Sequence, residues 1–130
     1  MYCKVMNRFV ILLSLALFPL QVSSHEMTPT YPEFKSSYID GVSITKMRLF
    51  NSRADVDYYQ IDVFDVNWNS IPFATTNRIM GISYLQTTYF DIYVRDLDEK
   101  QVEYICTTSK IKKDTTATTA ISSRICSKIK

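Results

Sequence analysis

The sequence contains a single histidine, His25, and only two glycines, Gly41 and Gly81. A Ser/His/Asp catalytic set needs a histidine held inside the fold as a base, which a histidine near a chain end does not provide. Two distant glycines cannot form a phosphate-binding loop, and no CxxC pair or metal-ligand cluster is present. These absences predict a protein that is not an enzyme and that binds no cofactor or metal.

The sequence also lacks an apolar run long enough to span a membrane, which requires about 20 residues. Its one long apolar stretch, residues 9–20, follows the basic residues Lys4 and Arg8 and precedes the small residues Val22-Ser23-Ser24. A basic head, a short apolar run and small residues are typical of a secretory signal peptide. We therefore predict that residues 1–24 form a signal peptide and that the chain is exported to the periplasm.

Removal of residues 1–24 from the 130 leaves 106, enough for one domain and too few for two. Lys4 and Arg8 are the only charges lost, so 13 of the 15 basic residues remain against 13 acidic ones. A net charge of zero gives no support to a nucleic-acid or other polyanion partner, which would need a concentrated positive field. Cys3 is lost as well, and the remaining even pair, Cys106 and Cys126, favours one disulfide in an oxidising compartment.

The processed chain would begin at His25. An N-terminal histidine can bind copper, but such sites need a second histidine. We expect His25 to lie without a role in a loose N-terminus. Pro29 and Pro32 forbid a helix and disfavour a central strand, so residues 25–41 are predicted to be an N-terminal arm or an edge segment.

Alternating apolar and polar residues, the signature of β-strands, recur from Val42 onward. Within residues 42–49 the apolar phase changes between Ile44 and Met47, which predicts a bulge or a strand crossing between sheets. In residues 58–64, Tyr59 and its alternate neighbours point inward. Further strands are predicted behind Pro72 and at residues 79–85 and 88–94.

The last two strands are predicted to form a hairpin, residues 102–109 and 121–129, with one cysteine in each. Pairing Cys106 with Cys126 would fix their register. The second strand carries Ile121, Ile125 and Ile129 on one face, interrupted by Ser123. These isoleucines could face a partner or simply this domain's own core, since alternation marks a half-buried strand in either case.

About seven short strands in a domain of this size, with no helical segment after the signal, predict an all-β, immunoglobulin-like β-sandwich at residues 42–130. The many tyrosines and threonines agree with this β preference. A small barrel is the alternative, because alternation alone does not separate the two architectures.

The order of several short motifs resembles the N-terminal domain of PapD-like periplasmic pilus chaperones. The motifs are MRLF, YYQIDVFD, IMGISYLQTTYFDIYVRD, EYICTTSK and CSKIK, which together cover most of residues 42–130. Members of that family have two immunoglobulin-like domains and work with an outer-membrane usher. The resemblance covers one of these domains, and it leaves open whether a second domain or a companion chain completes the binding cleft.

The resemblance implies donor-strand complementation, in which the last strand lends its apolar row to a pilus subunit. By position the donor row would be Ile121, Ile125 and Ile129. The family holds the subunit's terminal carboxylate with an arginine on the first strand and a lysine on the last, which Arg48 and Lys130 match. The plain alternatives are that Arg48 is an exposed strand charge and Lys130 a solvated end.

The sequence therefore predicts a chaperone-like module for pilus or surface-fibre assembly, with a fibre subunit and possibly an usher as partners. Two other functions remain open. A structural fibre subunit would need an incomplete sandwich and an N-terminal donor arm, for which Pro29 and Pro32 are poorly suited. A small exported interaction domain is the other, because a fold alone does not name a target.

Overall fold

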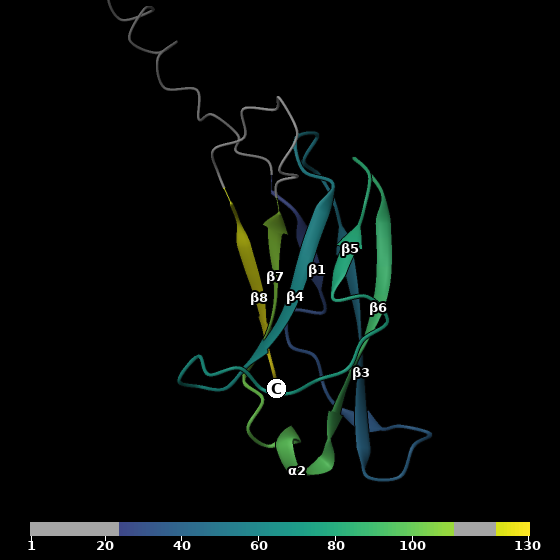
Figure 1. The fold of residues 1–130 in the computed structure, drawn as a ribbon, viewed down its shortest axis with the longest axis vertical. Coiled ribbons are helices and arrows are strands. Elements are labelled where there is room, and N and C mark those ends of the chain that lie inside the picture. Colours follow the sequence, from purple (N-terminus) through teal and green to yellow (C-terminus); the bar gives the residue numbers. More distant parts are fainter. Residues whose placement is uncertain (1–23, 111–121) are drawn as a thin grey trace, which may run out of the picture.

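Two antiparallel sheets packed face to face make up the computed structural model, which describes residues 24–110 and 122–130. Sheet A contains β1 (Glu26–Thr28), β2 (Lys35–Ser36), β3 (Val42–Phe50) and β6 (Thr87–Arg95). Sheet B has the order β5-β4-β7-β8, with β4 (Tyr58–Phe64), β5 (Ile79–Gly81), β7 (Tyr104–Lys110) and β8 (Arg124–Lys128). The strands run lengthwise, with the short helix α2 (Asp96–Glu99) at one end (Figure 1). This arrangement confirms the predicted sandwich and excludes the barrel.

The core lies between the sheets and is filled by every second residue of the long strands. The inward side chains are almost fully buried: Met47, Leu49, Ile61, Val63, Ile92, Val94 and Ile105. Because side chains alternate between the two faces of a strand, each sheet contributes one apolar face and exposes the other. Burial of these apolar side chains is the main driving force for this fold.

The change of phase predicted within residues 42–49 is wrong. β3 pairs with β6 without interruption from Val42 to Phe50, so Ser43 and Thr45 point inward, in phase with Met47 and Leu49. Ser43 Oγ lies 2.7 Å from Asp96 Oδ1 and 2.6 Å from Glu99 Oε2. A buried hydroxyl costs little free energy when it is hydrogen-bonded. Ser43 can therefore occupy an inward position in β3, although the apolar pattern of the sequence predicted otherwise.

The segment predicted as an arm or edge contributes two short strands to sheet A. β1 and β2 both pair antiparallel with β3, with Thr28 opposite Arg48 and Lys35 opposite Ile44. Residues 29–34 connect these two strands, whereas only residues 45–47 of β3 separate their partners. The connection is therefore too long to continue the ladder, and it leaves sheet A. Pro29 and Pro32 have no N–H to donate to a ladder, which agrees with this departure. The segment crosses to sheet B, where it meets β8.

Two predicted strands are shorter than expected. The strand expected at residues 79–85 is only β5, and the strand expected behind Pro72 is reduced to one isolated bridge, Ala74 with Tyr93. The charged connection before the last hairpin contains α2, whose Asp98 binds Arg95 at 2.7 Å. Within the described residues, no helix has the length and apolar character needed to cross a membrane.

Candidate functional site

β8 forms one margin of sheet B and is joined by a disulfide to its single neighbour in the sheet, β7. Cys106 and Cys126 lie directly opposite each other, with 4.1 Å between their Cα atoms. The predicted disulfide is confirmed, and it joins the two strands of the predicted hairpin. Figure 1 shows β8 beside β7 at the side of the molecule. A strand at a sheet margin has one unpaired backbone edge, which can template the addition of another strand.

The side chains of β8 alternate between the core and the outer face of sheet B. Cys126 lies on the outer face with Arg124 and Lys128, so Ile125, Ser127 and Ile129 point inward. Ile125 and Ile129 are partly buried and pack against the core. The structure therefore has these two isoleucines facing this domain's own core, one of the two alternatives that the sequence left open. Ile121 lies outside the described residues.

The outer backbone edge of β8, which faces away from β7, is hydrogen-bonded only near its C-terminal end. We call this end, at residues 127–130, the lower half of β8. Lys128 N–H donates to the Thr30 carbonyl at 3.1 Å, and Lys130 N–H donates to the Pro32 carbonyl at 3.2 Å. Ser127 Oγ adds a hydrogen bond of 2.8 Å to the Pro29 carbonyl. Residues 29–32 thus run alongside the end of β8 in the same direction, as an added parallel strand would.

The upper half of this edge is open. Outward and inward backbone groups alternate along a strand. Since Lys128 and Lys130 donate outward, the N–H groups of Arg124 and Cys126 point outward as well. The hydrogen bonds among the described residues give these two groups no partner. This short stretch, which we call the open edge of β8 (residues 124–126), pairs with no strand on its outer side among the described residues.

Arg48 and Lys130 lie on different sheets. Arg48 is exposed on β3, opposite Tyr89 of β6, and β3 is the third strand in the chain rather than the first. The strands before it, β1 and β2, contain no arginine. The match of Arg48 to the first strand of the chaperone pattern is therefore wrong in position, although its role is not tested by this placement.

Lys130 follows β8 and is engaged with a carboxylate. Its Nζ lies 3.0 Å from Glu33 Oε1, and this hydrogen bond holds the pKa of Glu33 below its usual value. Both side chains are more than half exposed. They border a hollow of about 550 Å³ that also includes Lys100, Glu103 and Ile129. The hollow carries charges of both signs, so it has no clear preference for an anion.

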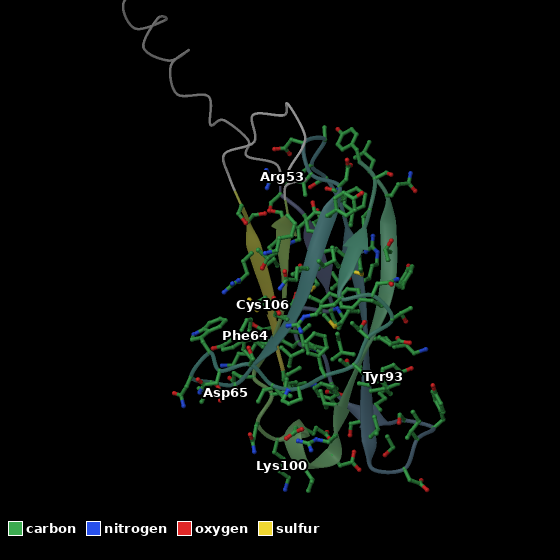
Figure 2. The ribbon with its side chains drawn as sticks, in the orientation of Figure 1. Arg53, Phe64, Asp65, Tyr93, Lys100 and Cys106 are labelled. Atoms are coloured by element: carbon green, nitrogen blue, oxygen red, sulfur yellow. A yellow bond between two sulfur atoms is a disulfide. The ribbon has the colours of Figure 1, made fainter. Side chains whose placement is uncertain are left out.

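A buried polar cluster occupies the opposite end of the sandwich, around Arg53 (Figure 2). Asn51, fully buried, donates to the carbonyls of Val56 and Ile82 and accepts from Tyr59 Oη at 2.6 Å. Burial raises the pKa of Tyr59 to about 12. Arg53 binds Asp55 through two nitrogens, at 3.0 and 2.7 Å, and this hydrogen bonding raises the pKa of its guanidinium.

His25 belongs to this polar cluster, and the prediction that it lies in a loose N-terminus is wrong. Its side chain is 1% exposed and its ring lies 4.6 Å from that of Tyr59. The sequence offered one indirect signal. Thr107, Ser109 and Ser123 are polar residues at inward positions near the same ends of β7 and β8, which indicates buried hydrogen bonding there. Nothing in the sequence connects His25 to them.

The outer face of sheet B carries an aromatic group near the lower end of β4. The rings of Trp68 and Tyr104 stack in parallel with centroids 4.4 Å apart, and Phe64 lies 5.7 Å from Trp68. Trp68 has a positive φ of 64°. Asp65 holds this turn by accepting from the N–H groups of Asn67 and Asn69, and the bond from Asn69 is the main reason why its pKa is lowered. Trp68 remains half exposed.

Solved structures of chaperones share this architecture. The E. coli chaperone DraB is 18% identical, with a TM-score of 0.60 over 82% of this chain and 53% of that chain. A chain from the complex of the Salmonella enterica SafA pilin with the SafB chaperone is 14% identical, with a TM-score of 0.61 over 84% of this chain and 54% of that chain. This chain has the fold of a PapD-like chaperone domain.

The resemblance predicted from the motifs is thus confirmed for the fold. The chain spans about half the length of these two neighbours. No family model matches the sequence, and no curated protein matches it. At these identities the likeness is one of backbone architecture, and the roles of individual residues have to be argued from the contacts of this chain.

Proposed function

We propose that this chain is a non-catalytic, exported chaperone-like module that binds a subunit of a pilus or surface fibre by donor-strand complementation. The observation that supports this most directly is the open edge of β8. A subunit strand could pair with the outward groups of Arg124 and Cys126, as in other cases of strand addition to a sheet edge. The Cys106–Cys126 disulfide would keep that edge in register while the partner binds.

The covered lower half limits where a partner can pair. Residues 30–32 already occupy the edge beside Lys128 and Lys130, so pairing would extend from residue 126 toward the start of β8. Ile125 and Ile129 pack against the core of this domain. Ile121, the third member of the predicted donor row, lies outside the described residues, and its contact with the subunit stays a proposal.

The carboxylate anchor remains a proposal. The ammonium of Lys130 binds the Glu33 carboxylate at an exposed position, and an exposed pair of this kind exchanges partners at little cost. The terminal carboxylate of a subunit could replace Glu33 there. Arg48 would contribute only if the bound subunit also contacts sheet A, because it projects from the outer face of β3.

The fold neighbours support the proposal of a fibre subunit as the partner. SafB is a chaperone whose structure was solved with the SafA pilin. We propose a pilus or fimbrial subunit as the partner of this chain and the periplasm as its location, with an outer-membrane usher as a further partner. The predicted signal peptide at residues 1–24 lies mostly outside the described residues.

A proline at position 124 tests the proposal. Arg124→Pro removes an outward N–H without removing a hydrogen bond to β7, and prolines are tolerated on the free side of edge strands. Arg124→Ala is the matched control, because it removes the same side chain and keeps the N–H. Each form is secreted into the periplasm together with a fibre subunit, first the SafA pilin and then any pilin-like subunit encoded beside this chain's gene.

We expect the wild type and Arg124→Ala to be recovered in complex with the subunit and Arg124→Pro to be recovered alone, with similar melting temperatures for all three. Equal recovery with alanine and proline would contradict pairing along β8. Arg48→Ala and Lys130→Ala, measured in the same way, test the anchor separately: each should lower recovery of the complex without changing the melting temperature.

A structural fibre subunit and a small interaction domain remain the alternatives. Residues 26–36 pair within this chain's own sandwich, where a fibre subunit would extend them to a neighbour. If the protein is a fibre subunit, it should polymerise by itself, and deletion of residues 25–40 should stop polymerisation. A monomer that captures no subunit would leave the interaction domain.

A further inference from the structure

His25 connects three strands at one end of the sandwich. It precedes β1, its Nε2 lies 3.0 Å from Thr107 Oγ1 and 3.2 Å from the Thr107 carbonyl of β7, and its Nδ1 lies 3.3 Å from Ser123 Oγ. Ser123 is the residue that leads into β8. A single imidazole therefore joins the N-terminal segment to the beginning of the edge strand.

The surroundings of the ring determine its protonation. A backbone carbonyl can only accept, so Nε2 carries the hydrogen and donates to Thr107. Nδ1 is then the bare nitrogen, and it accepts from the hydroxyl of Ser123. In the neutral ring, both nitrogens therefore have a hydrogen-bond partner. Protonation would place a second hydrogen on Nδ1. The Ser123 hydroxyl, which already accepts from Arg53 Nη1, would then have to turn and accept from a second cation.

The charged groups around the ring also oppose protonation. Arg53 Nη1 lies 3.3 Å from Ser123 Oγ, on the far side of the same hydroxyl, and 3.4 Å from Ser109 Oγ. The acid closest to this guanidinium, Asp55, is already engaged by it at 2.7 Å. Tyr59, whose ring contacts His25, and Asp57, which acts on Tyr59, are further titratable groups nearby, and in a chain processed after residue 24 the α-amino group of His25 would add another positive charge. A protonated His25 would be a second buried cation beside Arg53.

We propose that His25 is an acid-sensitive latch for the start of β8, which the neutral ring holds through Ser123 and which protonation releases. The release is confined to the upper end of the strand. The lower end keeps its bonds to residues 30–32, and the disulfide keeps the middle against β7. This inference concerns the free protein, so it does not depend on the identity of any partner.

The direction of the titration agrees with the latch. Burial lowers the pKa of His25 below its ordinary value of 6.5; the bond to Thr107 partly opposes this shift, and Arg53 adds to it. The unfolded chain therefore takes up a proton at a higher pH than the folded chain does. Stability associated with the neutral ring is present above pH 6.5 and falls as the pH falls below it.

Hydrogen exchange of single backbone amides tests the latch. Two amides report on the upper end: Ser109 N–H donates to the Ser123 carbonyl at 2.9 Å, and Ser123 N–H donates to Ser109 Oγ at 2.8 Å. The amide of Ile129, which donates to the Glu103 carbonyl at 2.9 Å, reports on the lower end and is the internal control. After correction for the intrinsic pH dependence of exchange, each amide gives a protection factor.

We expect the protection of Ser109 and Ser123 to fall about fivefold between roughly pH 7.5 and pH 5.5, while that of Ile129 stays constant. His25→Gln keeps a donor and an acceptor but cannot be protonated, so its profile should be flat. Ser123→Ala should also be flat at Ser109, although His25 still titrates. A flat wild-type profile, or an unchanged slope in His25→Gln, would overturn the proposal.

A second measurement covers the case in which the His25 variants do not fold. The imidazole resonances of the wild-type protein should titrate with a midpoint below 6.5, together with the amide shifts of Ser109 and Ser123. A His25 titration that leaves both amide shifts unchanged would show that the ring does not hold the start of β8. The latch would then be excluded without any variant.

Discussion

The two halves of β8 have the same alternation of side chains but different neighbours. The lower half, at Lys128 and Lys130, is bonded through its backbone to residues 30–32 on one side and to β7 on the other. The upper half, at Arg124 and Cys126, is also paired with β7 but has an open outer edge, and the disulfide and the side-chain contacts of Ser123 add to its attachment. One strand can therefore be part of a closed sandwich at one end and offer a pairing edge at the other.

Loss of the disulfide should have the largest effect. Replacing Cys106 and Cys126 by serine opens a loop with a sequence separation of 20, and the chain-entropy estimate for such a loop is about 3 kcal/mol. In a domain of this size that corresponds to a fall in melting temperature on the order of 10–20 °C, measured by circular dichroism.

The same double variant sharpens the comparison between the halves. Hydrogen exchange should increase more at Ser123 than at Ile129, because the lower half keeps its bonds to residues 30–32. The wild-type protein in reductant is the control and should behave like the variant. Equal loss of protection at the two ends would mean that the halves are not held independently.

Truncation of the two inward isoleucines should have an intermediate effect. Ile125→Ala in the upper half and Ile129→Ala in the lower half each remove a partly buried side chain that packs against the core. We expect each to lower the free energy of unfolding by about 1–2 kcal/mol, below the range for fully buried isoleucines. Urea titration measures it. An unchanged free energy, with loss of subunit capture, would instead assign these residues to the donor row.

Removal of the terminal ion pair should have the smallest effect. Lys130→Ala and Glu33→Gln break a contact between two side chains that are more than half exposed, while the backbone bond from Lys130 to Pro32 remains. Solvent screens such a pair strongly, so no change in melting temperature should be resolved. A fall of several degrees in either variant would show that the ion pair, rather than the backbone bonds, closes the lower half.

The outline of this fold could be predicted because it depends on local patterns. Alternation in residues 58–64 and 88–94 gives strands with one buried face whatever lies opposite, and two cysteines in adjacent strands favour a bridge. Where the local pattern conflicted with tertiary contacts, the prediction failed. Ser43 is buried because Asp96 and Glu99 of α2 supply carboxylates to its hydroxyl. These two acids follow Ser43 in the chain by 53 and 56 positions.

The candidate site was predicted only in part. The hairpin of the last two strands and its disulfide were predicted from the sequence, whereas the edge position of β8 came from the structure. Residues 29–32 cover half of that edge, a fact that requires the crossing of the N-terminal segment between sheets. Arg48 was matched to a first strand because β1 and β2 are too short to be recognised beside Pro29 and Pro32.

By itself, the sequence determined the β architecture, the presence of one cysteine in each of the last two strands and which residues of a strand share a face. These follow from the two-residue period of an extended chain and from composition. Only the tertiary structure decided which face of β8 meets the core, which part of its edge stays open and that His25 is buried among Thr107, Ser123 and Tyr59. Those outcomes depend on contacts between residues that are far apart in the chain, and such contacts leave no periodic trace in one sequence.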